Sequence, residues 1–196
     1  GLATALVTTS YVMDATPACF SAHVASRKGY GDILLQILDS RHEIVLGGDS
    51  KICREGGDGP MATAAARIRS SSELGFTLVT DAQQLAAAEG RILGLFPSRN
   101  GDPSYHGPPL ELSTRKVLDA LGGRESGFAA LVESEITDAA GHDNDIVALV
   151  EGVRELDIAI RVILDFAEHR GDTLVVVVAD HATGVPGIVS GMPQEA

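Results

Sequence analysis

The sequence predicts an α/β fold with a largely parallel central sheet and helices on both faces. Short β-branched runs alternate with longer amphipathic segments along the whole chain, and several of the short runs are continuously apolar. Continuously apolar strands are typical of parallel sheets, because helices cover both faces of such a sheet. The length of 196 residues suits one domain with its own core, so we expect a single α/β segment over residues 1–196.

The elements follow from these runs in chain order. The expected strands span Ala3–Thr9, Glu43–Leu46, Thr77–Thr80, Arg91–Phe96, Gly127–Val132 and Thr173–Ala179. The expected helices span Pro17–Ala25, Gly31–Ser40, Met61–Ser71, Ala82–Glu89, Glu111–Leu121 and Asp143–Arg170. The last helix has the clearest pattern, because apolar residues recur every three or four positions and two acidic residues favour its first turn. Ligands bind at the carboxyl ends of parallel strands, so site residues should follow strands directly.

Composition narrows the classes of function. Fifteen Lys and Arg against 27 Asp and Glu give a net charge of −12, with a pI near 4.8 and a mean hydropathy of +0.13. Such an acidic chain repels a phosphate backbone, so no nucleic acid is expected as a specific partner. No apolar run approaches the ~20 residues of a membrane span, and no signal peptide is visible. Cys19 and Cys53 are too few for a disulfide scaffold, although one disulfide between them stays open.

Carboxylate and imidazole pairs are the first candidates for a metal site. Residues four apart share one face of a helical turn and can hold one ion. The Asp-x-x-x-His pairs are Asp102/His106, Asp138/His142 and Asp165/His169. The first lies in a loop rich in proline and glycine and the third near a helix end, where solvated surface is the simplest interpretation. The middle pair differs because Glu133 precedes it at the end of an expected strand.

Asp180 and His181 follow the most apolar expected strand directly. Neighbouring residues within a strand point to opposite faces, but past its end both side chains can converge on one ion. The alternative is that a backbone carbonyl satisfies His181. Near the N-terminus, Asp14 and Thr16 follow the first expected strand, and Arg27 comes shortly after. Taken singly, Thr16 could cap a helix and Arg27 could be an ordinary surface charge.

Three blocks of sequence together resemble the alkaline phosphatase family. They are VTTSYVMDATPACFSAHVASRKGYG, LVESEITDAAGHDND and TLVVVVADHATG, in the family's order, and the resemblance extends from about Leu6 to Gly184. It implies an alkaline-phosphatase-like fold and a phosphomonoesterase that uses two zinc ions and one magnesium. Carried over by position, the resemblance implies that Asp138 and His142 bind the first zinc and that Asp180 and His181 bind the second. It implies that Thr16 and Glu133 bind magnesium, with Asp14 in the outer shell of that ion through water. Arg27 would bind the substrate phosphate.

The resemblance also implies parts that this sequence does not show. The family's nucleophilic serine lies upstream of the first block, and a further zinc-site histidine lies downstream of the third. Asp49-Ser50 matches the serine segment only superficially, because its flanking residues differ. Since Gly1 leads almost directly into an apolar strand, we expect the sequence to be an internal, incomplete piece of a longer protein. Ser134-Glu135 departs from the glycine-rich pair that usually follows the family's glutamate.

Several readings stay open from the sequence. The leading one is the central part of an alkaline phosphatase catalytic domain, acting on a small phosphomonoester. Alternatives are a truncated, non-catalytic metal-binding domain, another hydrolase of the same superfamily (a phosphodiesterase or sulfatase) or a phosphomutase, and a purely structural domain. The resemblance further implies a periplasmic or secreted protein that forms a homodimer.

Overall fold

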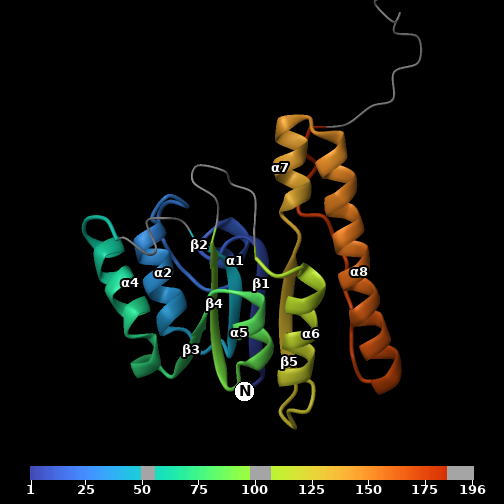
Figure 1. The fold of residues 1–196 in the computed structure, drawn as a ribbon, viewed down its shortest axis with the longest axis horizontal. Helices are drawn as coiled ribbons and strands as arrows, with labels where there is room; N and C mark the ends of the chain where they lie inside the picture. The colour runs from blue at the N-terminus through green and yellow to red at the C-terminus, as the bar shows by residue number, and fades with distance from the viewer. Residues whose placement is uncertain (50–55, 98–106, 185–196) are drawn as a thin grey trace, which may run out of the picture.

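The strands of the computed structural model form one parallel sheet. The structure describes residues 1–49, 56–97 and 107–184, and within these the sheet has five strands in the order β3–β4–β2–β1–β5 (Figure 1). The strands are β1 (Ala3–Tyr11), β2 (Ile44–Asp49), β3 (Phe76–Val79), β4 (Arg91–Pro97) and β5 (Phe128–Glu133). Every neighbouring pair is parallel, which confirms the predicted sheet and places all carboxyl ends of the strands at one edge.

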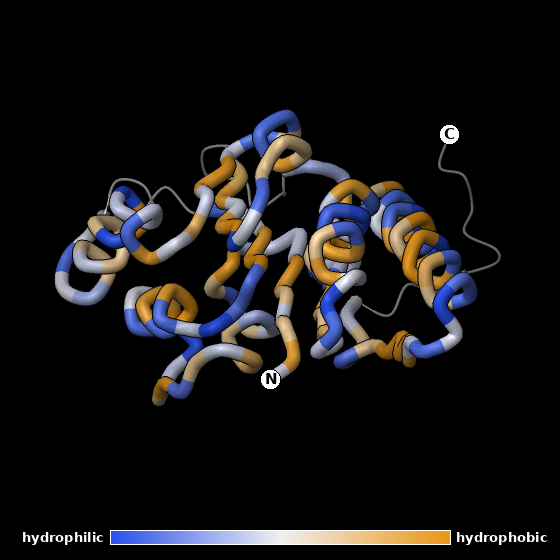
Figure 2. Tube along the Cα trace, turned by 90° about the horizontal axis from the view of Figure 1, so that it is seen from below, coloured by the Kyte–Doolittle hydropathy of each residue, from blue (hydrophilic) through white to orange (hydrophobic). Residues whose placement is uncertain are grey.

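Helices cover both faces of this sheet, as predicted. The helices are α1 (Ala15–Cys19), α2 (Tyr30–Asp39), α4 (Pro60–Arg69), the 3-10 helix η1 (Ser71–Leu74), α5 (Ala82–Ala87), α6 (Leu110–Leu121), α7 (Ile136–Asp143) and α8 (Ile146–Arg170). Helices α2 and α4 pack with one face in a first hydrophobic cluster, and α5 and α6 pack with the other face in a second. Apolar segments therefore concentrate along the strands in the middle of the molecule (Figure 2).

The core is densest around β2 and β4. Ile33, Leu34 and Leu93 are fully buried in the first cluster, and Leu85 and Ile92 in the second. Burying one such side chain contributes about 1.5–3 kcal/mol. This part of the sheet is thus a stable platform for loops at its carboxyl edge.

The predicted strand Thr173–Ala179 is wrong in this structure. The segment follows α8 without pairing to the sheet, and Leu174 and Val178 are 87% and 80% exposed. It runs instead along β5, where the two line a groove of about 810 Å³. An apolar run predicts burial, but a strand also needs a partner for its backbone hydrogen bonds, and the described sheet ends at β5.

Two predicted helices also have different bounds. Helix α1 ends at Cys19 and not at Ala25; after it, the Ser21 hydroxyl donates to the Pro17 carbonyl and lies 3.1 Å from His42 Nε2, so this part of the chain is held by side-chain contacts and not by helical backbone bonds. The helix predicted over Asp143–Arg170 is confirmed as α8, which begins three residues later, at Ile146, and α7 before it was not among the expected helices. Asn144 has a left-handed backbone (φ 54°) that ends α7, and the Asp145 carboxylate accepts from the first backbone N–H groups of α8.

Candidate functional site

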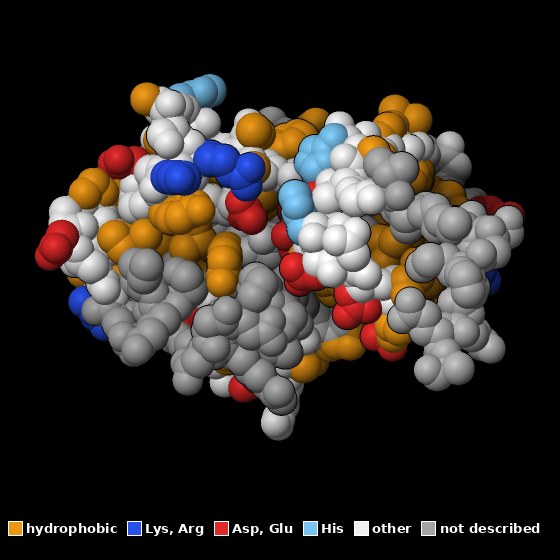
Figure 3. Space-filling model, turned by 90° about the horizontal axis from the view of Figure 1, so that it is seen from above, with side chains coloured by type: hydrophobic (Ala, Val, Ile, Leu, Met, Phe, Trp, Pro, Cys, Tyr) orange, Lys and Arg blue, Asp and Glu red, His pale blue; other side chains and the backbone are white. Residues whose placement is uncertain are grey.

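The predicted site residues gather at the carboxyl ends of β1 and β5. The two strands are neighbours, and Thr8 lies opposite Glu133, the last residue of β5. Asp14 follows β1 and caps α1, because its carboxylate accepts from the Ala15 backbone N–H at 2.8 Å. Seen from above, acidic and histidine side chains lie together on this face (Figure 3).

Thr16 and Glu133, the predicted magnesium ligands, are in contact. The Thr8 hydroxyl donates to Oε2 of Glu133 at 2.6 Å, and the Thr16 hydroxyl lies close enough to the same carboxylate to lower its pKa. Burial raises the pKa of Glu133, and the nearby charges of Asp14 and Asp180 act in the same direction, while the two hydroxyls oppose the shift. The sheet register therefore assembles this pair from residues more than a hundred positions apart.

Arg27 is held at this edge of the sheet by an ion pair with Asp14. Its Nη2 atom lies 2.8 Å from Asp14 Oδ1, while the Ser10 hydroxyl donates to Oδ2 at 2.7 Å. Burial works to raise the pKa of Asp14, but the hydrogen bonds from Ser10, the Ala15 N–H and Arg27 outweigh it and hold the pKa below its usual value. Asp14 thus stays charged and orients Arg27, whose side chain is 67% exposed.

The four predicted zinc ligands form one chain of contacts on α7 and the segment after α8. His142 Nε2 lies 3.5 Å from Asp138 Oδ2, one helical turn away. His181 Nδ1 lies 3.8 Å from Asp138 Oδ1, and its Nε2 lies 3.1 Å from Asp180 Oδ2. Asp138 therefore stands between the two predicted zinc pairs.

The donor types and spacings suit divalent ions in pairs. Two ligands at the usual 2.0–2.2 Å from one tetrahedral zinc lie roughly 3.3 Å apart. The contacts within the two pairs, 3.5 Å for Asp138/His142 and 3.1 Å for Asp180/His181, are near this value. Among the described residues, no group of three or more His, Cys, Asp and Glu side chains could hold an ion. Each pair fits part of a zinc shell.

Glu135 is a further carboxylate of this site that sequence reasoning noted only as a departure from the family. Its backbone N–H donates to Thr9 Oγ1 at 2.8 Å, which holds it beside the end of β1. Burial raises the pKa of Glu135 to about 7, and the charges of Asp14, Glu133 and Asp138 add to the shift. A cation bound near these carboxylates would relieve this repulsion.

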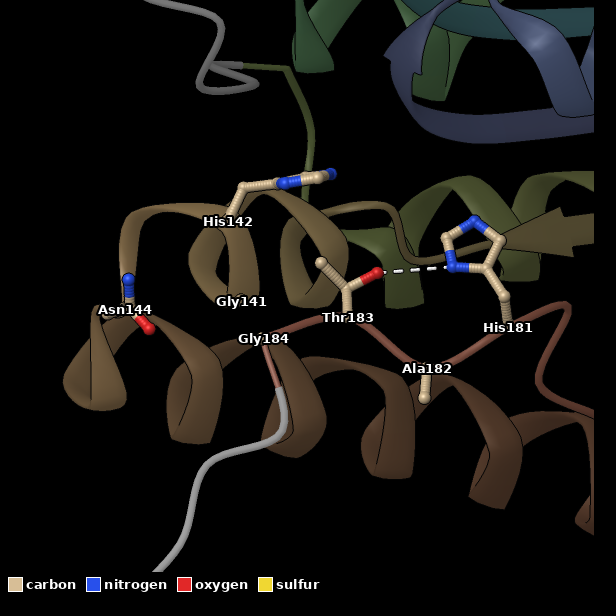
Figure 4. Close-up of a pocket in the computed structure, with 7 residues that line it drawn as sticks. All are labelled: Gly141, His142, Asn144, His181, Ala182, Thr183 and Gly184. Atoms are coloured by element: carbon tan, nitrogen blue, oxygen red, sulfur yellow. Dashed lines mark hydrogen bonds between the residues drawn. The ribbon is translucent and has the colours of Figure 1, made fainter.

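Thr183 is a site residue that sequence reasoning missed. Its hydroxyl donates to Asp138 Oδ1 and lies 3.1 Å from His181 Nδ1 (Figure 4). It lines a pocket of about 430 Å³ together with Gly141, His142 and His181. The available signal was a hydroxyl two residues after the Asp-His pair.

The remaining candidates lie apart from this site or outside the description. Asp165 and His169 are exposed on α8, and His169 Nδ1 bonds to the Asp165 backbone oxygen at 2.6 Å, which confirms them as surface residues. Cys19 is a free, exposed thiol. The pair Asp102/His106, Ser50 and Cys53 lie outside the described residues.

Known proteins match nearly the whole chain. The family model for alkaline phosphatase matches residues 1–194. Alkaline phosphatase 3 of Bacillus subtilis is 33% identical, over 94% of this chain and 41% of that protein. Alkaline phosphatase of Escherichia coli is 30% identical, over 93% of this chain and 49% of that protein. Streptomycin-6-phosphate phosphatase of Streptomyces griseus is 32% identical, over 92% of this chain and 52% of that protein.

Solved structures give the same picture. Thermus thermophilus alkaline phosphatase superposes with a TM-score of 0.83 at 29% identity, over 94% of this chain and 40% of that one. A variant of the TAB5 alkaline phosphatase with magnesium bound in its M3 site has a TM-score of 0.76 at 26% identity, over 93% of this chain and 53% of that one. This chain thus spans about half the length, or less, of the relatives it matches. From the family model, the relatives and the shared parallel fold, the chain belongs to the alkaline phosphatase family.

Proposed function

We propose that the whole protein hydrolyses phosphate monoesters with two zinc ions and one magnesium, and that this chain supplies metal-binding and phosphate-binding residues. The observation that carries the proposal is the position of Asp138. It contacts His142, its partner in the first predicted zinc pair, and also His181 of the second pair, beside the Thr16–Glu133 pair. Membership of the alkaline phosphatase family supports the reaction class.

In this proposal each metal has its own pair of side chains. Asp138 and His142 hold the first zinc, Asp180 and His181 the second, and Thr16 and Glu133 the magnesium, with Asp14 acting through water. Imidazole and carboxylate suit zinc, while an all-oxygen set suits magnesium. The magnesium in the TAB5 variant supports that ion for this family. Zinc ions held by these two pairs would supply Lewis-acid stabilisation for the attacking and leaving oxygens of an in-line displacement.

Arg27 binds the phosphate. A guanidinium donates to two phosphate oxygens from its planar fork, which a lysine cannot reproduce. Asp14 engages the Nη2 atom at 2.8 Å, and the exposed remainder of the side chain leaves donors for the substrate. Asp14 therefore both orients Arg27 and lies next to the proposed magnesium.

The attacking serine belongs, in this proposal, to a part of the protein outside these 196 residues. The chain alone then binds metal without turnover. If the metal-binding residues serve no catalysis in the whole protein either, the function is that of a non-catalytic metal-binding domain. Turnover of p-nitrophenyl phosphate by the whole protein separates the two.

Two measurements test the proposal. Zinc per chain is measured by mass spectrometry after equilibrium dialysis, for wild type, Asp180→Ala and the surface control Asp172→Ala. Loss of zinc only in Asp180→Ala supports the site, and equal zinc in all three removes Asp180 from it. In the whole protein, Arg27→Ala should weaken inhibition by inorganic phosphate more than it lowers kcat, whereas Arg161→Ala on the α8 surface should change neither.

Export and homodimer formation stay predictions from the family. Among the helices that the structure describes, none is long and apolar enough to cross a membrane. Sedimentation of the whole protein tests the dimer, and fractionation of the producing cells tests a periplasmic or secreted location.

A further inference from the structure

The hydroxyl of Thr183 joins ligands that are assigned to different zinc ions. It donates to Asp138 Oδ1, a ligand of the first proposed zinc. It also lies 3.1 Å from Nδ1 of His181, a ligand of the second, and the close-up shows both side chains on the segment that passes under α7 (Figure 4). Thr183 itself follows the ligand pair and belongs to neither ion in the proposed assignment.

The single hydrogen of the Thr183 hydroxyl sets the direction of these contacts. A carboxylate can only accept, so that hydrogen points to Asp138. The hydroxyl oxygen then faces Nδ1 of His181 and can accept from it. With Nδ1 turned to Thr183, Nε2 of the same ring faces a carboxylate oxygen of Asp180 at 3.1 Å, the other ligand of the second proposed zinc.

The backbone holds Thr183 in this position. A Cβ atom on Gly141 would lie 2.8 Å from the Thr183 carbonyl oxygen, so only glycine lets this part of α7 approach the segment so closely. Gly184 has a left-handed backbone (φ 73°), and a Cβ there would collide with the Gly141 carbonyl. The close contact between these two glycines thus fixes how near the Thr183 segment lies to α7.

From these observations we infer that Thr183 is a positioning residue that fixes Asp138 and orients His181 with Nε2 toward the second zinc. The inference rests on the proposed metal site. Partners that hold a metal ligand from behind set its tautomer and ring orientation, and their loss costs about 10–100-fold in metal affinity. A methyl group in place of the hydroxyl would free both ligands at once.

The test is zinc affinity of the 196-residue chain, measured by competition with a chromophoric chelator. Thr183→Val should bind zinc about 10–100-fold more weakly than wild type. Thr183→Ser, which keeps the hydroxyl, should bind like wild type. The control Thr173→Val removes an exposed hydroxyl of the same segment, one that bonds only to Asp172, and should change nothing.

The outcomes separate this inference from the proposed function. A wild-type chain that binds no zinc overturns the metal site and the role of Thr183 with it. If wild type binds zinc and Thr183→Val binds equally well, the site stands and the role of Thr183 is wrong. The same holds if Thr183→Ser is as weak as Thr183→Val. Should Thr183→Val fail to fold, Thr183→Ala takes its place, with the same loss of affinity expected.

Discussion

The two sides of the molecule differ in how far they are buried. Around β2 and β4, helices cover both faces of the sheet, and residues such as Leu34 and Leu93 are fully buried. Around β5, α8 and the segment that follows, apolar side chains are open to solvent: Val150 is 51% exposed and Leu174 is 87% exposed. The packed side carries most of the stability, whereas the open side carries much of the site.

The proposed metal site lies across this boundary. Asp14, Thr16 and Arg27 follow β1 on the packed side. The strand register places the end of β1 beside Glu133, Thr16 and Asp14 lie near that carboxylate, and Arg27 pairs with Asp14. The zinc ligands come from α7 and the exposed segment after α8, where polar contacts such as that of Thr183 replace burial. We therefore expect core substitutions to change stability, and substitutions near α7 to change metal binding.

The largest expected effect is on stability, and it should differ between a buried and an exposed leucine. Leu34→Ala on α2 empties a fully buried position and should lower the free energy of unfolding by about 3 kcal/mol, or the Tm by roughly 6–12 °C. Leu164→Ala on α8, where the side chain is 50% exposed, should cost under about 1 kcal/mol. Thermal unfolding by circular dichroism measures both, and equal losses would contradict the division into two sides.

A glycine substitution should affect the metal site more than the fold. In a helix interior Gly→Ala usually stabilises by about 1 kcal/mol, but a Cβ on Gly141 meets the Thr183 carbonyl at 2.8 Å. Gly141→Ala should therefore weaken zinc binding about tenfold, as loss of a supporting contact does. Gly123→Ala is the control, because a Cβ there has no atom within 4 Å. Equal zinc affinity in the two variants would show that the close approach does not matter.

The charge of Glu135 should make the metal-free chain less stable at alkaline pH. Burial, with the charges of Asp14, Glu133 and Asp138, raises the pKa of Glu135 to about 7, above the value of 4.5 for an unperturbed glutamate. Between these pH values the folded chain holds more protons than the unfolded chain, so its stability falls as the pH rises. With a chelator present, Glu135→Gln should gain about 1 kcal/mol at pH 8, after allowance for solvent screening, and nothing near pH 4.

Thermal unfolding of the two proteins across this pH range checks that prediction. Glu125→Gln, at an exposed position before β5, is the matched control. A gain that does not change with pH would mean that Glu135 is not charged against its neighbours.

The smallest expected effect concerns surface ion pairs on the open side. Arg161 lies 2.9 Å from Asp157 on α8, with both side chains more than half exposed. Such pairs contribute about 0.3–0.5 kcal/mol, so Arg161→Ala should move the Tm by less than about 2 °C. A loss of several degrees would mean that α8 is stabilised by its surface charges and not by its contacts with α6 and α7.

The sequence predicts the parts of the fold that depend on local pattern and burial. Apolar runs predicted β1 to β5 correctly, because each of these segments finds a neighbouring strand to pair with in the sheet. The same signal was wrong for Thr173–Ala179, since no described strand pairs with it. The last helix was predicted to begin three residues early, at Asp143, because the left-handed backbone of Asn144 ends α7 there and Asp145 caps α8.

The residues of the site also divide into those that the sequence predicts and those that only the structure reveals. Resemblance to the family named the residues that the structure brings together around Asp138, Glu133 and Asp14. Thr183 could not be found in this way, because its role depends on the path of the segment after α8 beneath α7. Glu135 was visible as a departure, but its raised pKa depends on the carboxylates that the fold gathers around it.

Calorimetric titration of the 196-residue chain with zinc tests the central claim most directly. Asp138→Asn and Asp165→Asn alter two Asp-x-x-x-His pairs of identical spacing, one in the proposed site and one on the α8 surface. We predict saturable zinc binding by wild type and by Asp165→Asn, and a loss of at least about tenfold in affinity for Asp138→Asn. Equal affinity in all three proteins, or no binding by wild type, would contradict the account.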